Sequence, residues 1–221
     1  MVAIYFLLQA IVATAIPLLV RTLPASATQA LAAIVSLIIA APSVMWLIHR
    51  KWQAWWSRSA PPGLGFATAQ PRFLAAAVIA GLLAPLLGGL LTHWLAQNHP
   101  VPQDIRQLGG QASIGWRLPL ALVAVAVGPL VEETLFRGTL LSALMPRWGT
   151  GWAVTLSSLL FALVHLPGLQ FHLYALPALT LLALTLAWLR LHSGSIWPPV
   201  LAHASNNLLA VIVWFVAPGV G

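Results

Sequence analysis

Long apolar stretches, separated by short polar or basic segments, set the pattern of this chain. Because a helical span needs about 20 predominantly apolar residues, each stretch is a candidate membrane helix. The stretches lie at 2–20, 28–48, 73–96, 117–145, 151–166, 172–190 and 196–216. The pattern predicts an all-α, polytopic transmembrane helical bundle of about seven spans, within a range of six to eight, that encloses an intramembrane polar cavity.

Composition agrees with this prediction and narrows the classes of function. The 221 residues are 60% hydrophobic and 6% charged, which favours one membrane domain over 1–221. The absence of cysteine excludes disulfides, thiolate catalysis and cysteine-ligated metals. The net charge of +7 comes from basic residues that lie mostly at the ends of spans and form no basic stripe. We therefore expect contact with a lipid bilayer and no nucleic-acid partner.

The basic residues also predict an orientation. The loop 49–72 is basic and contains Trp52, Trp55 and Trp56, a mixture typical of an anchor at the cytoplasmic interface. With this loop inside, the N-terminus is cytoplasmic and the C-terminus external, and the basic residues outside the spans divide six to three. Asp104, in the polar stretch 97–116, is expected to be a solvated loop charge. A compact chain with short loops suits a bacterial inner membrane.

Two of the three acidic residues, Glu132 and Glu133, are adjacent inside the stretch 117–145. Charged groups within a span are costly and usually mark a functional site. On a helix, Glu133 and Arg137 lie about 40° apart and one turn along, which favours an ion pair. Glu132 lies about 140° from Arg137 and must face another partner. A purely structural role, in which both acids neutralise Arg137, remains open.

Polar groups on two further spans are candidate partners for Glu132. Glu132 and His165 each lie about 21 Å from the expected cytoplasmic ends of their helices, so they can meet at one level. His203 and Asn207, four residues apart, share one face of the last span. His203 is only about 12 Å deep, so it reaches the others only if 192–199 dips into the membrane. A membrane histidine can also serve only as an interhelical hydrogen-bond donor.

These residue types suit the hydrolysis of an amide bond. A carboxylate in a poorly hydrated cavity can take a proton from water and return it to the leaving amine. A neighbouring histidine can hold the water, while a second histidine and an amide side chain can donate hydrogen bonds to the oxyanion.

The chain resembles the CPBP family of intramembrane proteases, which includes the CAAX-prenyl endopeptidases and the bacterial Abi, bacteriocin-processing and immunity proteins. The resemblance lies in three motifs, Glu132-Glu133-x-x-x-Arg137, Phe161-x-x-x-His165 and His203-x-x-x-Asn207. It covers roughly 117–216, the expected catalytic core, whereas the N-terminal spans of 1–100 carry no motif.

The resemblance implies an α-helical membrane endopeptidase whose base is Glu132. His165 would position the water, and His203 with Asn207 would form the oxyanion hole. Glu133, Arg137 and Phe161 would support the site. The implied substrate is a membrane-embedded or lipid-anchored protein or peptide.

Metal dependence and two other functions stay open. The family is often labelled metalloprotease, and a zinc ion held by His165, His203 and Glu132 is the alternative to a cofactor-free site. Because only two histidines lie on the motifs and no HExxH pair exists, we favour the metal-free glutamate mechanism. The competing functions are a non-catalytic membrane immunity or binding protein and a proton-coupled transporter. The transporter is disfavoured because the chain lacks inverted-repeat halves.

Overall fold

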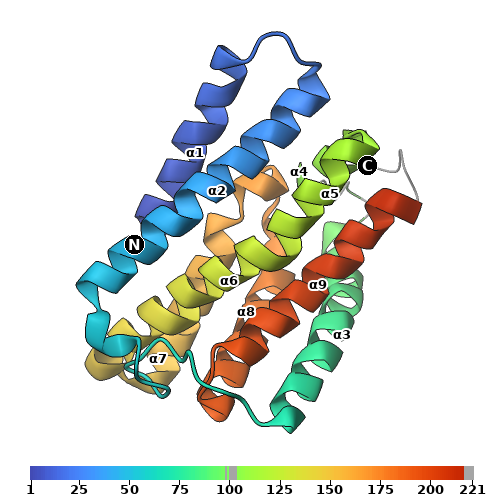
Figure 1. Cartoon of the computed structure of the whole chain (residues 1–221). Coiled ribbons are helices and arrows are strands. Elements are labelled where there is room, and N and C mark those ends of the chain that lie inside the picture. The colour runs from blue at the N-terminus through green and yellow to red at the C-terminus, as the bar shows by residue number, and fades with distance from the viewer. Residues whose placement is uncertain (98, 100–103, 217–221) are drawn as a thin grey trace.

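A computed structural model describes residues 1–97, 99 and 104–216 of the chain, and in this part helices are joined by short loops without any β-strand (Figure 1). The α-helices are α1 (Val2–Leu19), α2 (Ala25–Lys51), α3 (Pro71–Ala96), α4 (Asp104–Gln111), α5 (Ile114–Leu122), α6 (Gly128–Glu133), α7 (Leu141–Val164), α8 (Leu176–Ser193) and α9 (Trp197–Val216). Two π-helical segments are η2 (Val123–Val127) and η3 (Thr134–Leu140). Short 3₁₀ turns are η1 (Gln53–Trp55), η4 (Pro167–Leu169) and η5 (Leu173–Ala175).

Six helical runs in the described part are long and apolar enough to cross a membrane. The predicted helical membrane bundle is therefore confirmed, and the number of runs falls within the predicted range. The predicted stretches coincide with these runs to within a few residues. Asp104 begins α4, and the position of its side chain lies outside what the structure describes.

The fourth and fifth predicted spans form one helical run, Ile114–Val164, that turns back on itself. The turn is at Gly149, whose φ of 75° and ψ of 168° are non-helical. Glu132 contacts His165, and the ring of Phe136 contacts that of Phe161. Both pairs are spaced symmetrically about residues 148 and 149, so the two legs lie side by side and antiparallel.

Two widened turns bracket α6, the segment that carries both glutamates. The N–H of Gly128 bonds to the carbonyl of Val123, five residues earlier, as in a π-helix. Pro129 explains the widening, because a proline ring crowds the carbonyl four residues before it in a regular α-helix. The sequence predicts a bend near Gly128 and Pro129, and the chain relieves that crowding with a π-helical segment.

The segment 52–70 folds across the end of the bundle where α7 turns and α8 passes into α9, at the bottom of Figure 1. Main-chain contacts attach it there, since the N–H of Ile196 donates to the carbonyl of Gly65 at 2.7 Å. The buried guanidinium of Arg190 donates to the carbonyls of Ser59 at 2.7 Å and Gly63 at 2.8 Å. The expected interfacial loop is thus also a cap that buries the α8–α9 junction.

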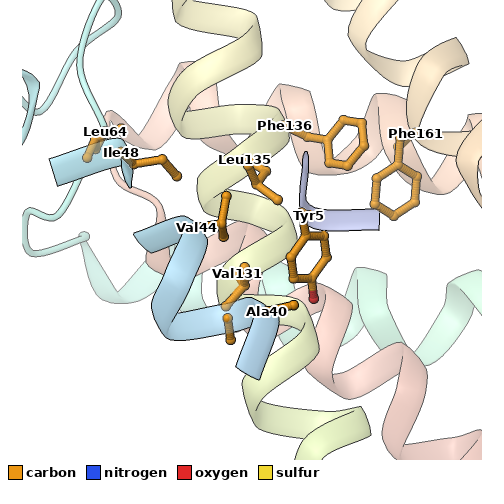
Figure 2. Packing of buried hydrophobic residues seen from close by; sticks show 11 residues of the cluster. Tyr5, Ala40, Val44, Ile48, Leu64, Val131, Leu135, Phe136 and Phe161 are labelled. Carbon is orange, nitrogen blue, oxygen red and sulfur yellow. The ribbon is translucent and has the colours of Figure 1, made fainter. Parts of the chain in front are cut away.

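The apolar core next to the acidic segment brings α1 and α2 against the first leg of the hairpin (Figure 2). Its buried members include Tyr5, Ala40, Val44, Ile48, Leu64, Val131, Leu135, Phe136 and Phe161. Because Tyr5 comes from α1 and Phe161 from α7, this cluster fixes the N-terminal helix beside the two legs that carry the acids and His165.

Candidate active site

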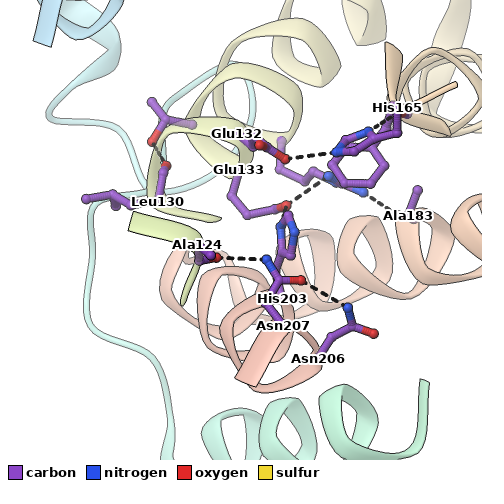
Figure 3. A network of polar contacts seen from close by, with 12 residues as sticks. Ala124, Leu130, Glu132, Glu133, His165, Ala183, His203, Asn206 and Asn207 are labelled. Carbon is purple, nitrogen blue, oxygen red and sulfur yellow. Dashed lines mark hydrogen bonds and ion pairs between the residues drawn. The ribbon is translucent and has the colours of Figure 1, made fainter. Parts of the chain in front are cut away.

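Glu132 and His165 meet across the hairpin, with 3.4 Å between Oε2 and Nε2 (Figure 3). The other ring nitrogen, Nδ1, lies 2.7 Å from the carbonyl oxygen of Phe161. A carbonyl only accepts hydrogen bonds, so Nδ1 carries the hydrogen and the lone pair of a neutral ring faces Glu132. The depth argument from the sequence agrees with this contact.

Both groups in this pair are acceptors when Glu132 is ionised and His165 is neutral. A water molecule that lies against both can donate one hydrogen to each. The side chains of Glu132 and His165 are 14% and 29% exposed, so the pair is partly accessible although it lies within the bundle. This arrangement can hold and deprotonate a water molecule.

Glu133 forms a separate, fully buried network on the other side of the helix. Its Oε1 lies 3.0 Å from Nη1 of Arg137, which confirms the predicted i,i+4 ion pair. Nη2 of the same guanidinium donates to the carbonyl of Ala183 at 2.8 Å, and its charge lies 4.6 Å from the ring centroid of Phe161. Arg137 thereby ties α6, α7 and α8 together.

His203 joins this second network rather than the Glu132 pair. Its Nδ1 lies 3.0 Å from Oε1 of Glu133, and since a carboxylate accepts, Nδ1 is the protonated nitrogen. His203 therefore reaches the level of the acids, although the depth estimate from the sequence placed it too shallow. The preceding residues Ser195 and Ile196 are buried beneath the cap 52–70, which gives α9 a buried start.

Asn207 lies one turn beyond His203 and bonds to η2. Its Nδ2 donates to the carbonyl of Ala124 at 2.9 Å, and its Oδ1 accepts from Asn206 at 3.1 Å (Figure 3). The carbonyl of Ala124 is available because the residue five positions on, Pro129, has no N–H to give in a π-helical turn. No contact joins Asn207 to Glu132 or His165 in the described part of the chain.

The ring of Phe161 lies between the two histidines, with centroid distances of 4.6 Å to His165 and 5.6 Å to His203. The alternative zinc ligands Glu132, His165 and His203 do not converge, and within 1–97, 99 and 104–216 no three His, Cys, Asp or Glu side chains form a metal site. The side chains present therefore do not fit a zinc ion in this arrangement.

Sequence reasoning missed the contribution of α1 to this region. The ring of Phe6 lies 6.2 Å from that of His165, and Tyr5 is buried in the adjacent core. The available signal was weak: Tyr5 is one of two tyrosines, and Gln9 follows it by one turn in an otherwise apolar stretch.

The expected polar cavity remains a prediction. Two grooves on the described surface, of about 500 and 520 Å³, lie elsewhere and have mostly apolar linings. The first lies between α7 and α8 and the second lies on α2. The Glu132–His165 pair instead occupies the seam between the two legs of the hairpin.

Comparison with known proteins gives a family match over this region. The model of the Rce1-like family, described as type II CAAX prenyl endopeptidase Rce1-like, matches residues 114–209. This match supports the resemblance of the segment to the CPBP family. The matched segment contains all three motifs and the π-helical segments around α6, whereas α1, α2 and α3 lie outside the match.

Two relatives extend the comparison. The chain is 32% identical over 94 residues to a Bacillus subtilis (strain 168) protein named "Putative membrane peptidase YdiL", covering 42% of this chain and 36% of YdiL. It is 28% identical over 170 residues to an Escherichia coli protein named "Uncharacterized 24.3 kDa protein", covering 76% of this chain and 73% of that protein. The chain thus matches about a third of the length of YdiL. No solved structure matches it significantly.

Proposed function

We propose that this protein is an intramembrane endopeptidase that hydrolyses a peptide bond in a membrane-associated substrate. The observation that carries the proposal is the contact between Glu132 and His165, in which the free Nε2 of the ring lies 3.4 Å from Oε2 of the carboxylate. The match of residues 114–209 to the Rce1-like family supports the same reaction class.

In this mechanism a water molecule that lies against both Glu132 and His165 is the nucleophile. Glu132 takes a proton as the water oxygen adds to the substrate carbonyl, and His165 holds the water in line. When the C–N bond breaks, the proton held by Glu132 passes to the leaving nitrogen. General base catalysis of this kind contributes about 100- to 10,000-fold.

The second network positions the groups around the tetrahedral intermediate. Asn207 donates one amide hydrogen to the carbonyl of Ala124 and has a second that it can donate to the oxyanion. His203 is oriented by Glu133, and its Nε2 becomes a donor when the ring is protonated. Arg137 holds Glu133 in place through their ion pair, so it acts through that carboxylate rather than on the substrate.

The proposed reaction uses no cofactor, since Glu132 serves as the base and cannot also be committed to zinc. The proposed substrate is a membrane-embedded or lipid-anchored protein or peptide. We place the protein in a bacterial inner membrane with a cytoplasmic N-terminus, on the distribution of basic residues along the spans.

A comparison of peptide termini tests the function even while the substrate is unidentified. Membranes from cells expressing the wild-type chain or the Glu132→Gln variant at equal levels are analysed by mass spectrometry for new C-termini. We expect termini that occur only with the wild type. Identical terminus profiles from the two membranes would reject peptidase activity and favour a binding or immunity protein.

A further inference from the structure

The N-terminal helix buries one side chain that carries a polar group in the core next to the acidic segment. Tyr5 is completely buried and is the only fully buried residue of α1. Its ring packs in the same cluster as Val131 and Phe161 (Figure 2). Val131 directly precedes the candidate base in the sequence, and Phe161 lies one helical turn before His165. The remainder of α1 packs mainly on α2, so Tyr5 and Phe6 are its link to the site.

The hydroxyl of Tyr5 has no hydrogen-bond partner among the described residues. A buried hydroxyl without a partner costs free energy that a phenylalanine would avoid. The charge of Glu132 acts on this hydroxyl, and Gln9, one turn along α1, lies within reach of a hydrogen bond to it. The cluster holds this hydroxyl close to the acidic segment, where it can turn from Gln9 to a group that enters the site.

The hydrogen-bond donors of the motif residues His203 and Asn207 are already partly used within the protein. The hydrogen on Nδ1 of His203 points to Glu133, and one amide hydrogen of Asn207 points to Ala124. A neutral His203 then offers only a lone pair at Nε2. The site thus has one unshared amide hydrogen on α9, where the oxyanion of amide hydrolysis usually needs more than one donor.

We propose that Tyr5 is a catalytic residue whose hydroxyl donates a hydrogen bond to the oxyanion of the tetrahedral intermediate. This inference rests on the proposed peptidase function. When the water oxygen bonds to the carbonyl carbon, the carbonyl electron pair moves to oxygen and the Tyr5 hydroxyl stabilises it without losing its proton. Collapse reforms the carbonyl and breaks the C–N bond, and the proton on Glu132 goes to nitrogen.

The test is Tyr5→Phe, which removes the hydroxyl and keeps the ring in its cluster. The probe is an internally quenched peptide with a farnesylated cysteine three residues from its C-terminus, added to purified protein in detergent. We expect kcat to fall about 100-fold and KM to stay unchanged. The unfolding temperature should be unchanged or slightly raised. Ser158→Ala is the matched control, because Ser158 also has a buried, unpartnered hydroxyl and should keep the wild-type rate.

Three results would overturn the inference. Wild-type kcat in Tyr5→Phe, alongside inactive Glu132→Gln, would reject the role of Tyr5 and leave the peptidase function standing. A lower unfolding temperature with unchanged kcat would make the hydroxyl structural, bonded to Gln9. A wild-type protein that cleaves neither the probe nor any membrane protein in the terminus comparison would remove both proposals together.

Discussion

Adjacent acids in one helix have separate partners in this protein. Glu132 faces His165 across the hairpin and is partly exposed, whereas Glu133 is buried between Arg137 and His203. Because neighbouring residues differ by about 100° around a helix, one dipeptide can serve two networks. The side chains of the first network are partly exposed, whereas those of the second are buried.

This division predicts different consequences for the two amide substitutions. Glu132→Gln should remove activity and leave the unfolding temperature close to that of the wild type, because the amide cannot accept a proton from water. Glu133→Gln should lower the free energy of unfolding by about 3–5 kcal/mol, because it leaves the buried charge of Arg137 unpaired. Thermal unfolding in detergent, measured beside peptide cleavage, checks both. Two equally stable and equally inactive variants would contradict the division.

At the residue scale, the sequence predicted contacts along one helix better than contacts between helices. The Glu133–Arg137 pair follows from a spacing of four residues, and the meeting of Glu132 with His165 follows from equal depth. The bond between His203 and Glu133 did not follow, because the depth of α9 depends on the cap 52–70. The bond from Asn207 to Ala124 needs a free carbonyl that only the π-helical turn before Pro129 provides.

At the scale of elements, the hairpin Ile114–Val164 sets the register of the site. Its turn depends on Gly149, whose φ of 75° and ψ of 168° lie in a region that is open essentially to glycine alone. A Cβ at this position would meet no atom within 4 Å, so the constraint is in the backbone and not in packing. A glycine at position 149 is therefore needed to keep Glu132 aligned with His165.

Gly149→Ala should accordingly destabilise the protein by about 1–3 kcal/mol and reduce cleavage, since relief of the strain shifts one leg against the other. Gly151→Ala is the matched control, because Gly151 also has no neighbour within 4 Å and lies in helical backbone. Unfolding temperatures and cleavage rates of the two variants provide the comparison. Equal stability in both would show that the turn tolerates a side chain.

The π-helical segments were beyond prediction from hydrophobic periodicity, which assumes 3.6 residues per turn. Pro129 indicated a disturbance, but a proline can produce a kink, a break or a widened turn. The cap 52–70 could not be predicted either, because Arg190 binds main-chain carbonyls. Every residue has such a carbonyl, so no residue type in the sequence indicates this contact. The helices themselves were predictable since membrane spans must be long and apolar.

At the scale of the whole molecule, the fold and the charge distribution together predict one orientation in the membrane. The cap 52–70, the turn at Gly149 and the α8–α9 junction lie at one end of the bundle, and the α1–α2 connection lies at the other (Figure 1). The basic loop at the capped end predicts that this end faces the cytoplasm.

Single cysteines test this orientation cleanly, because the chain has none of its own. Ser57→Cys lies in the exposed part of the cap, and Thr22→Cys lies in the exposed α1–α2 connection. In intact spheroplasts, a membrane-impermeant maleimide should label the cysteine at position 22 and should label position 57 only after permeabilisation. The reverse pattern would invert the proposed topology.

The central claim is that Glu132 and His165 activate water without a metal ion, and one rate measurement addresses it directly. The rate is that of cleavage of the farnesylated quenched peptide by purified protein in detergent, before and after treatment with a zinc chelator. We predict an unchanged rate for the wild type and a fall of about 100- to 10,000-fold for folded Glu132→Gln under both conditions. Loss of wild-type cleavage on chelation, with recovery on addition of zinc, would contradict the claim and make Glu132 a metal ligand.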